Sequence, residues 1–327
     1  MKAIVQDRYG SVDVLELREI ERPVPGDDEV LVRVRAASVN AYDWHFMRGD
    51  PYFARMIMGL GGPKARIRGR DCAGVVEAVG ARVTGLVPGD EVYGEVDGTF
   101  AEYVCVPDNA VARKPANLTF EQAAALPLAA NTALIGLRDV GAGQRVLING
   151  ASGGVGTMAV QLAKAQGAEV TGVCSTRNVD LVRSLGADHV VDYTQEDFAR
   201  DARRYDLVFD LVGNRSLTDL RRVLTPDGTL ALSGGGTSNG GSFFGPYGLF
   251  LKARVVASFI RHRVVFVAAH QSKQNLDALR ELAEAGTLVP VIEATYPLSE
   301  AAKAIRHVEI EHARAKVVVT TRAASPT

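Results

Sequence analysis

The sequence predicts an α/β fold in which a doubly wound parallel sheet is joined to a β-barrel. From about residue 120, short apolar segments alternate with helical patterns, an alternation typical of parallel sheets with right-handed crossovers. Before that point, strand-like segments are separated by turn signals such as Pro25-Gly26, Pro88-Gly89-Asp90 and Asp97-Gly98. Closely spaced short strands of this kind favour a compact barrel.

The first region contains clear strand patterns at Glu29–Ala36, where polar and apolar residues alternate, and at Gly74–Val79. The second region carries five apolar segments that we expect to be strands, at residues 145–149, 169–174, 189–192, 206–211 and 229–233.

The last part of the chain returns to the first pattern. It has one clear helix, Lys273–Ala285, followed by the apolar segment Val289–Glu293 and a final strand, Ala315–Thr320. We therefore expect a discontinuous domain of residues 1–120 and 270–327 around a second domain of residues 121–269. Ligand is expected in the cleft between them, at the carboxyl ends of the parallel strands.

Composition limits the classes of partner. The 327 residues include 37 Lys and Arg against 38 Asp and Glu, a formal net charge of -1, which gives no electrostatic reason to expect nucleic acid or an anionic membrane. No segment has the apolar length of a membrane span, and the start of the chain has no signal or transit pattern. Cys72, Cys105 and Cys174 show no C-x-x-C spacing, so we expect reduced cysteines and a cytoplasmic protein.

The most informative segment is a glycine-rich turn between a strand and a helix. Gly150, Gly153, Gly154 and Gly156 follow the apolar strand 145–149, and helical spacing continues to Ala165. Strand, glycine turn and helix together form a phosphate cradle, because glycine permits close approach and the helix N-terminus offers free N–H groups. A turn that uses glycine only for steric reasons is the alternative. The context on both sides favours a Rossmann domain whose pyrophosphate contacts are Ser152, Gly153, Gly154, Val155 and Gly156.

The next strand indicates which dinucleotide binds. Proteins that bind NAD place an acid about 20 residues after the glycines, on the ribose 2′-OH. Here Ser175, Thr176, Arg177 and Asn178 stand at that point, and the first acid is Asp180. Hydroxyls, an amide and a guanidinium suit a 2′-phosphate, so we predict NADPH, held by Ser175, Arg177 and Asn178. The alternative is that the hydroxyls cap the next helix and Arg177 is solvated.

These segments and several others resemble the medium-chain dehydrogenase/reductase superfamily over nearly the whole chain. The further matches are Gly69–Gly80, Pro88–Val92, Gly98–Tyr103, Leu185–Asp188 and Lys316–Val319. The resemblance implies that the barrel is the GroES-like catalytic domain of that superfamily.

The zinc alcohol dehydrogenases of the superfamily carry an early Cys and a Gly-His-Glu triplet. This chain has Asn40 and Gly69-Arg70-Asp71 at those places, and the four-cysteine structural lobe is missing. Since Asn and Arg cannot complete a zinc site, we predict no metal. The segments Ser38–Asp43, Cys174–Asn178 and Val191–Tyr193 resemble the zinc-free quinone oxidoreductase branch, which includes the alkenal and enone reductases. Ala41 and Asn131 depart from that branch's pattern.

The resemblance implies hydride transfer from NADPH to a quinone, or to the C=C bond of an α,β-unsaturated carbonyl, with a small hydrophobic substrate. Three alternatives stay open: an enoyl-thioester reductase, a non-catalytic NADPH-binding sensor or structural protein, and, least favoured, an alcohol dehydrogenase. The thioester alternative needs a basic patch, and Lys64, Arg66 and Arg68 form the nearest cluster.

By resemblance, Asn40 lines the cleft and donates to the developing oxyanion; alternatively it caps a helix starting at Ala41. Tyr42 and Tyr52 are the phenols that could donate a proton, although each could also be a packing residue. Asp43 is expected to fix local structure. Arg70 is expected either to point into the cleft or to pair with an acid such as Asp71.

Five further residues complete the cofactor site by resemblance. Tyr193 is expected against the adenosine-phosphate side and Thr132 at the nicotinamide end. Ser233, Gly234 and Gly235 begin a loop whose backbone would meet the nicotinamide ribose, or which is simply a surface loop.

Two apolar segments concern substrate and assembly. Tyr52–Leu60 is rich in Met, so it would either roof a hydrophobic pocket or form a helix packed on the barrel. Arg263–Ala269 resembles the superfamily's edge strand that pairs across a two-fold axis, which implies a homodimer.

Overall fold

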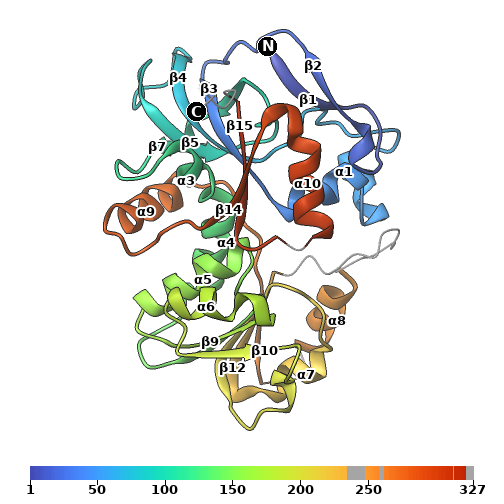
Figure 1. The fold of residues 1–327 in the computed structure, drawn as a ribbon, viewed down its shortest axis with the longest axis vertical. Coiled ribbons are helices and arrows are strands. Elements are labelled where there is room, and N and C mark those ends of the chain that lie inside the picture. Colours follow the sequence, from blue (N-terminus) through green and yellow to red (C-terminus); the bar gives the residue numbers. More distant parts are fainter. Residues whose placement is uncertain (234–246, 258–260, 312, 322–327) are drawn as a thin grey trace. The chain divides into compact units, whose positions relative to one another are not determined.

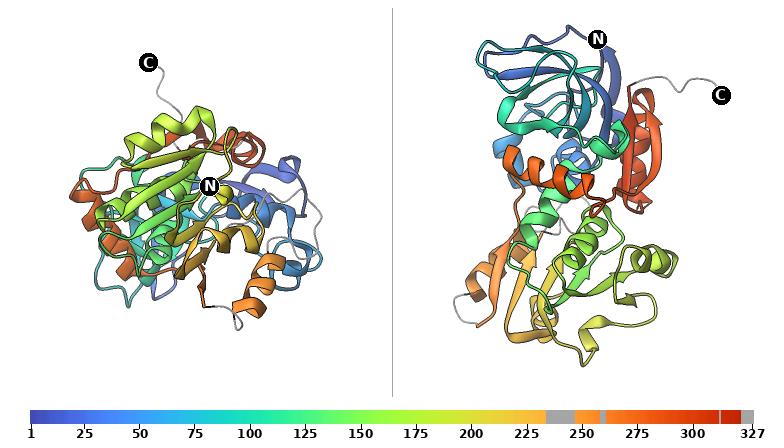
Figure 2. Two further views of the ribbon diagram at one scale, coloured as in Figure 1. Left: turned by 90° about the horizontal axis from the view of Figure 1, so that it is seen from below. Right: turned by 90° about the vertical axis from the view of Figure 1, so that its left-hand side faces the viewer.

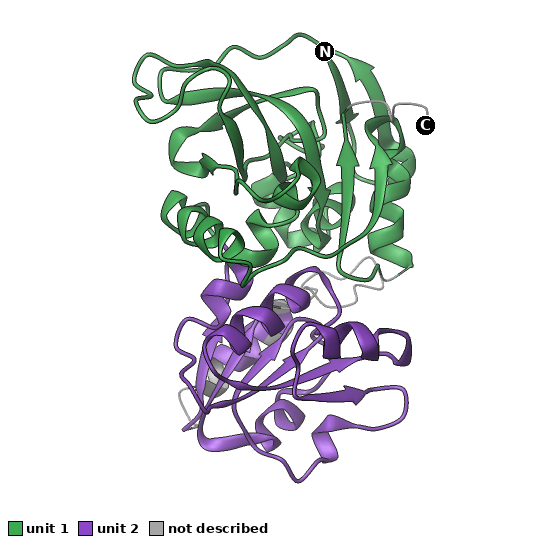
Figure 3. Ribbon diagram, turned by 60° about the vertical axis from the view of Figure 1, so that its left-hand side comes forward, with its two compact units in different colours: residues 1–131, 270–327 green, residues 132–269 purple. Residues whose placement is uncertain are grey.

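The computed structural model describes residues 1–233, 247–257, 261–311 and 313–321. It divides into two compact units, Met1–Asn131 with His270–Thr327, and Thr132–Ala269 (Figure 3). The division therefore lies at residues 131 and 270, where the sequence placed it at 120 and 270. The difference arises because α3 (Phe120–Ala124) packs against strands of the first unit, and α4 (Pro127–Gly136) begins in that unit and ends in the second.

The second unit is a parallel sheet of six described strands. They are β8 (Arg145–Asn149), β9 (Glu169–Cys174), β10 (His189–Asp192), β11 (Tyr205–Asp210), β12 (Leu224–Leu232) and β13 (Arg263–Phe266). Their order is β10-β9-β8-β11-β12-β13, which is the order of dinucleotide-binding folds with β8 as first strand. Figure 1 labels β9, β10 and β12 of this sheet. The strand predictions are confirmed. β12 begins earlier than expected, because Leu224 already pairs with Tyr205 before a register shift.

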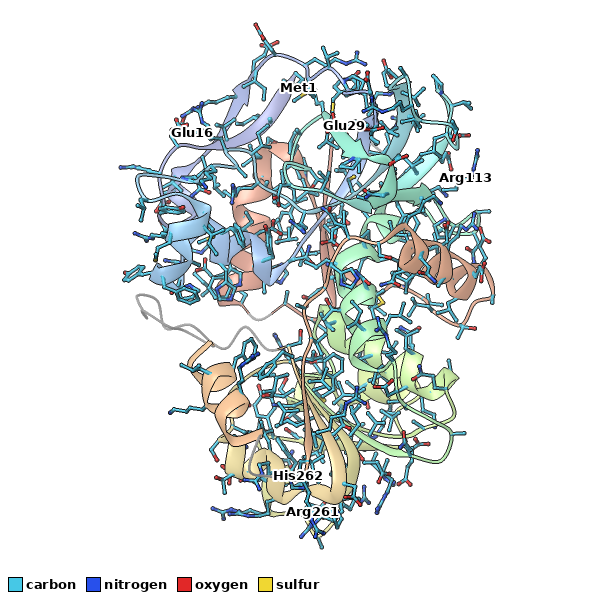
Figure 4. All side chains as sticks on the ribbon, turned by 180° about the vertical axis from the view of Figure 1, so that it is seen from behind. Met1, Glu16, Glu29, Arg113, Arg261 and His262 are labelled. Carbon is cyan, nitrogen blue, oxygen red and sulfur yellow. The ribbon has the colours of Figure 1, made fainter. Side chains whose placement is uncertain are left out.

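The helices of this unit connect successive parallel strands. They are α5 (Gly154–Ala165), α6 (Val179–Ser184), α7 (Leu217–Arg222) and α8 (Tyr247–Ala257). α5 packs on β8 and β9 and buries Met158 and Leu162, which explains its apolar stripe. Arg261 and His262, labelled in Figure 4, lead into β13 at one edge of the sheet.

The first unit is built on a mainly antiparallel sheet with the order β14-β15-β3-β4-β5-β7, and β6 also pairs with β3. The strands are β3 (Glu29–Val39), β4 (Asp71–Val79), β5 (Glu91–Glu95), β6 (Tyr103–Pro107), β7 (Val111–Arg113), β14 (Ile292–Pro297) and β15 (Lys316–Thr320). A separate hairpin is formed by β1 (Lys2–Gln6) and β2 (Leu15–Glu19), and isolated bridges pair it with Ile67 and Ala101, outside the strands of the larger sheet. The segment predicted from Val289 becomes strand only at Ile292, after Pro290, which has no N–H to donate.

Besides α3 and the first part of α4, this unit contains the helices α1 (Ala41–Arg48), α2 (Arg55–Met58), α9 (Lys273–Glu284) and α10 (Ala301–Ile310). α10 lies beside β14 and β15 (Figure 2) and also packs on α1. β15 runs antiparallel to β3 with Val317 opposite Val39. This register carries Lys316, from the far end of the chain, to the point where β3 ends and α1 begins.

Candidate functional site

The glycine turn after β8 has the geometry of a tight cradle. Gly150 has φ of 90°, a conformation that favours glycine. A Cβ on Gly156 would lie 2.1 Å from the Gly150 carbonyl oxygen, so the helix can approach the turn only because this residue is glycine. At Gly153, the N-cap of α5, a Cβ would meet only that same oxygen, at 3.4 Å. The first N–H groups of α5 have no partner within the helix and are available to an anion.

Three residues predicted to bind the cofactor meet beside this turn. Asn178 is buried, and its Nδ2 donates to Ser152 Oγ at 3.1 Å and to Ser175 Oγ at 3.2 Å. Its Oδ1 is buried and accepts no hydrogen bond in the described residues. A buried acceptor without a donor is costly in a folded protein, so this atom indicates a place where a ligand group could bind.

The neighbouring surface carries Arg177, which is exposed, and Tyr193, which is 54% exposed. Sequence reasoning missed Asp192, the last residue of β10. Its carboxylate accepts from Thr176 Oγ1 at 2.6 Å, Thr194 Oγ1 at 2.8 Å and Gln195 Nε2 at 2.9 Å. These hydrogen bonds, that from Thr176 above all, hold the pKa of Asp192 below its usual range. In the sequence, Asp192 could have been found only as a carboxylate at the carboxyl end of a predicted strand, which the structure pairs with β9.

A second polar group that sequence reasoning missed lies where β8 and β11 end. Asn149 Nδ2 donates to Asp210 Oδ1 at 2.8 Å and to Asn214 Oδ1 at 3.1 Å. Asp210 Oδ2 is buried and accepts no hydrogen bond in the part of the chain that the structure describes. The order of strands reverses between β8 and β11, which is where doubly wound sheets bind ligands.

The remaining cofactor predictions are Thr132 and the segment that follows β12. Thr132 is buried in α4, and Ser233 follows β12, with its N–H bonded to the Asp210 carbonyl at 3.0 Å. Gly234 and Gly235 lie outside the described residues. Asn131, which departs from the residue pattern of the quinone oxidoreductase branch, has a structural role. Its side chain donates to the His270 carbonyl at 2.8 Å and accepts from Asn275 at 2.7 Å.

In the first unit, Asn40 is the N-cap of α1, which was one of its two predicted roles. Its backbone N–H donates to Asp43 Oδ2 at 2.7 Å, so Asp43 fixes the start of the helix as expected. The Asn40 Nδ2 donates to Asp71 Oδ2 at 3.0 Å and to the Ser38 carbonyl at 3.3 Å. Both amide hydrogens therefore have partners within the protein.

Lys316 completes this cluster. Its Nζ lies 2.6 Å from Asn40 Oδ1 and 3.6 Å from Asp71 Oδ2, and both charged side chains are almost fully buried. Burial lowers the pKa of Lys316, although Asp71 and Asp43 oppose that shift. Burial also raises the pKa of Asp43 to about 7. Sequence reasoning treated Lys316 only as part of a matching segment, because nothing local connects it with residues 276 positions away.

Arg70 pairs with acids, which was one of its two sequence expectations, although its partners are Glu95 and Asp97 and not Asp71. Its Nε donates to Glu95 Oε1 at 2.9 Å and its NH1 to Asp97 Oδ1 at 3.0 Å. Successive residues of a strand point to opposite faces, and Asp71 begins β4 facing Ser38 and Lys316 instead. NH1 also donates to the Tyr42 hydroxyl at 3.2 Å, and that hydroxyl donates to Asp97 at 3.2 Å. Burial, with Asp97 nearby, raises the pKa of Tyr42.

Tyr52 differs from Tyr42. It opens a turn that continues into α2, its side chain lies against the Arg55 guanidinium, and the residue is 43% exposed. The same segment exposes Met56, Ile57 and Leu60, so it does not form the helix packed on the barrel that was the alternative expectation.

The described residues contain neither a cluster of metal ligands nor a helix that could span a membrane. No three His, Cys, Asp or Glu side chains gather in a group that could hold a metal ion. No helix among residues 1–233, 247–257, 261–311 and 313–321 is both long and apolar enough to cross a membrane. The prediction of no metal continues to rest on the residue types at Asn40 and Arg70.

Comparison with known proteins identifies two matching family descriptions. Residues 26–116 match the alcohol dehydrogenase GroES-like domain, and residues 185–319 match the zinc-binding dehydrogenase description. The chain is 37% identical to the mitochondrial NAD(P)H oxidoreductase RTN4IP1 of Mus musculus, over 98% of this chain and 89% of the relative. It is 36% identical to the chloroplastic NADPH-dependent alkenal/one oxidoreductase of Arabidopsis thaliana, over 98% of this chain and 79% of the relative. The structure of the quinone oxidoreductase from Coxiella burnetii superposes with a TM-score of 0.85 at 30% identity, over 98% of this chain and 99% of that one.

Proposed function

Since the chain belongs to the quinone oxidoreductase and alkenal/enone reductase branch of the medium-chain dehydrogenase/reductase superfamily, we propose that it reduces quinones or conjugated C=C bonds with NADPH and without zinc. The enzyme class and the nicotinamide cofactor follow from the family. The observation that carries the proposal within this chain is the group formed by the glycine turn, Ser152, Ser175 and Asn178. Bound there, the cofactor would supply the hydride.

The residues of the second unit fit a dinucleotide phosphate. The close approach at Gly156 and the open position at Gly153 leave the α5 N-terminus accessible to a pyrophosphate. Ser152 and Ser175 offer hydroxyls beside it. Asn178 Oδ1, which accepts no hydrogen bond from the described residues, offers an acceptor for a ribose hydroxyl.

The preference for NADPH rests on charge. Arg177 is exposed and follows Ser175 closely in the chain, whereas Asp192, which ends the neighbouring strand β10, already accepts from Thr176, Thr194 and Gln195. A 2′-phosphate would therefore contact a guanidinium and hydroxyl groups, which attract it, and not a carboxylate that still lacks hydrogen-bond donors.

On the substrate side, the three predicted catalytic residues differ in what they can offer. Both hydrogens of the Asn40 amide have partners in the cluster, and the Tyr42 hydroxyl is bonded to Arg70 and Asp97. We therefore assign the proton-donating or oxyanion-stabilising role to Tyr52, whose phenol is half-exposed beside the Arg55 cation. Asn40 is assigned the role of holding α1, and Tyr42 with it, in place.

We also propose a homodimer that pairs through β13, because this strand stands at one edge of the sheet and an uncovered edge invites pairing. The mouse and Arabidopsis relatives are named as mitochondrial and chloroplastic, so a cytoplasmic location stays a prediction.

The test is NADPH oxidation against quinones, enones, 2-alkenals and enoyl-CoA esters, with NADH and a metal chelator as controls. We expect chelator-insensitive turnover with a quinone or enone, faster with NADPH than with NADH. Tight NADPH binding with no turnover on any acceptor would contradict the proposal and favour a sensor, and selective turnover of enoyl-CoA esters would favour a thioester reductase.

A further inference from the structure

One segment of the first unit presents bulky apolar side chains to solvent. Met56 is 74% exposed, Ile57 75% and Leu60 79%, all within a few residues of one another. Other exposed aliphatic side chains of this unit, such as Val24 and Val87, stand separately along the chain. Single exposed apolar residues are common, but a group of three indicates a binding surface.

The base of this segment is held firmly. Arg55 donates from Nε to the Gly49 carbonyl at 2.9 Å and from NH2 to the Arg48 carbonyl at 2.9 Å. Its guanidinium also lies 4.6 Å from the ring centres of both Tyr9 and Tyr52, and the Tyr9 hydroxyl donates to the Gly59 carbonyl at 2.7 Å. The three side chains are thus displayed on an anchored turn, not on a loose loop.

The size of the surface limits what can occupy it. Three such side chains offer a few hundred Å² at most, whereas each partner of a stable protein interface buries about 800 Å². An area of a few hundred Å² matches a single alkyl or prenyl chain. Met56 suits such a ligand, because its flexible thioether adapts to varied shapes.

The position of the surface connects it with the proposed chemistry. Tyr52 begins the 3-10 turn Tyr52–Ala54, and α2 follows directly. Rises of about 2.0 Å and 1.5 Å per residue place the end of α2 within roughly 12 Å of Tyr52. A ligand whose carbonyl oxygen meets the Tyr52 hydroxyl could therefore lay its chain on Met56, Ile57 and Leu60.

We propose that Met56, Ile57 and Leu60 bind the apolar chain of the acceptor, so that the preferred substrates are quinones or enones bearing a long alkyl or prenyl chain. This inference rests on the proposed function and names the substrate class of the same site.

The experiment compares kcat/KM for a homologous series of 2-alkenals, from butenal to dodecenal, in the wild type and in the triple variant M56S/I57S/L60S. The double variant V24S/V87S is the matched control, since it removes exposed aliphatic side chains elsewhere on the same unit. In the wild type and the control, kcat/KM should rise about two- to fourfold per added methylene until the surface is filled. In the triple variant this rise should disappear, while turnover of butenal stays unchanged.

Other outcomes would overturn the inference. If kcat/KM of the triple variant still rises with each methylene as in the wild type, the surface does not bind the acceptor chain. Turnover by the enzyme would then still support the proposed function. If the triple variant loses vesicle binding or dimerisation while its kcat/KM still rises with chain length, the surface binds a membrane or a second copy of the chain. Absence of turnover on every acceptor by the wild type would defeat both proposals. Should the triple variant fail to fold, the single variant Leu60→Ser, expected to lose part of the rise, gives the same test.

Discussion

Two buried asparagines, one in each unit, stand at the same kind of place and differ in their hydrogen bonds. Asn40 is the N-cap of α1 and Asn178 the N-cap of α6. Lys316, Asp71 and the Ser38 carbonyl engage both ends of the Asn40 amide. Asn178 donates to two serine hydroxyls, and its Oδ1 accepts nothing in the described residues.

This difference distinguishes a buried polar group that stabilises the fold from one that can bind a ligand. A buried polar group whose partners are all internal stabilises one arrangement of the chain. A buried group left without a partner raises the free energy of the empty protein, and a ligand can recover that cost. On this reasoning the Asn40 cluster maintains the fold, and the Asn178 cluster is the one that we propose binds the cofactor.

The largest effect is expected from Lys316→Met, which leaves Asp71 buried without its cation. Breaking a buried pair by removing one partner costs about 3–5 kcal/mol, so the free energy of unfolding in urea should fall by that order. Lys303→Met is the control, since Lys303 is an exposed lysine on α10 with a surface ion pair. Equal stability of the two variants would contradict the structural role of the cluster.

The next effect is a pH dependence that arises from Asp43. Its pKa is about 7 in the folded chain against an ordinary 3.8, so the folded state binds the proton more tightly than the unfolded state. The stability from this group is therefore complete below about pH 4 and is lost as pH rises through about 7, by up to about 4 kcal/mol. Asp43→Asn should flatten that part of the stability profile measured by urea unfolding. A profile that keeps its slope would show that Asp43 is not the group responsible.

Substitutions of Gly153 and Gly156 test the phosphate cradle of the second unit. Gly156→Ala places a Cβ 2.1 Å from a backbone oxygen and should cost about 1–3 kcal/mol of stability even without cofactor. Gly153→Ala meets little in the protein, so its melting temperature should stay unchanged while its Kd for NADPH rises. Unimpaired NADPH binding by Gly153→Ala would indicate that no phosphate approaches this turn.

A smaller effect should separate the two dinucleotides. Arg177→Ala would remove the charge-assisted contact that we propose with the 2′-phosphate, so the Kd for NADPH should rise about tenfold, or 1.4 kcal/mol. The Kd for NADH should not change. Titration of NADPH and NADH into the wild type and the variant measures the change in each Kd. An equal loss of affinity for NADH would refute the assignment of Arg177.

Much of the second unit could be predicted from the sequence because its information is local. The bounds of β8, β9 and β10 follow from apolar segments, and the glycine turn is contiguous with its helix. The Asn40 cluster could not be predicted, since it depends on the register of β15 on β3. Arg70 shows the same limit, because its partners Glu95 and Asp97 are selected by the alternation of β4 and its pairing with β5.

The most direct measurement takes the two asparagines together: the free energy of unfolding and the Kd for NADPH of Asn40→Ala and Asn178→Ala. Asn40→Ala should lose about 2–3 kcal/mol of stability with little change in NADPH affinity. Asn178→Ala should keep its stability to within about 1 kcal/mol and bind NADPH about tenfold more weakly. If the two variants behave alike, or if their effects are exchanged, the distinction between a saturated structural cluster and an open binding cluster is wrong.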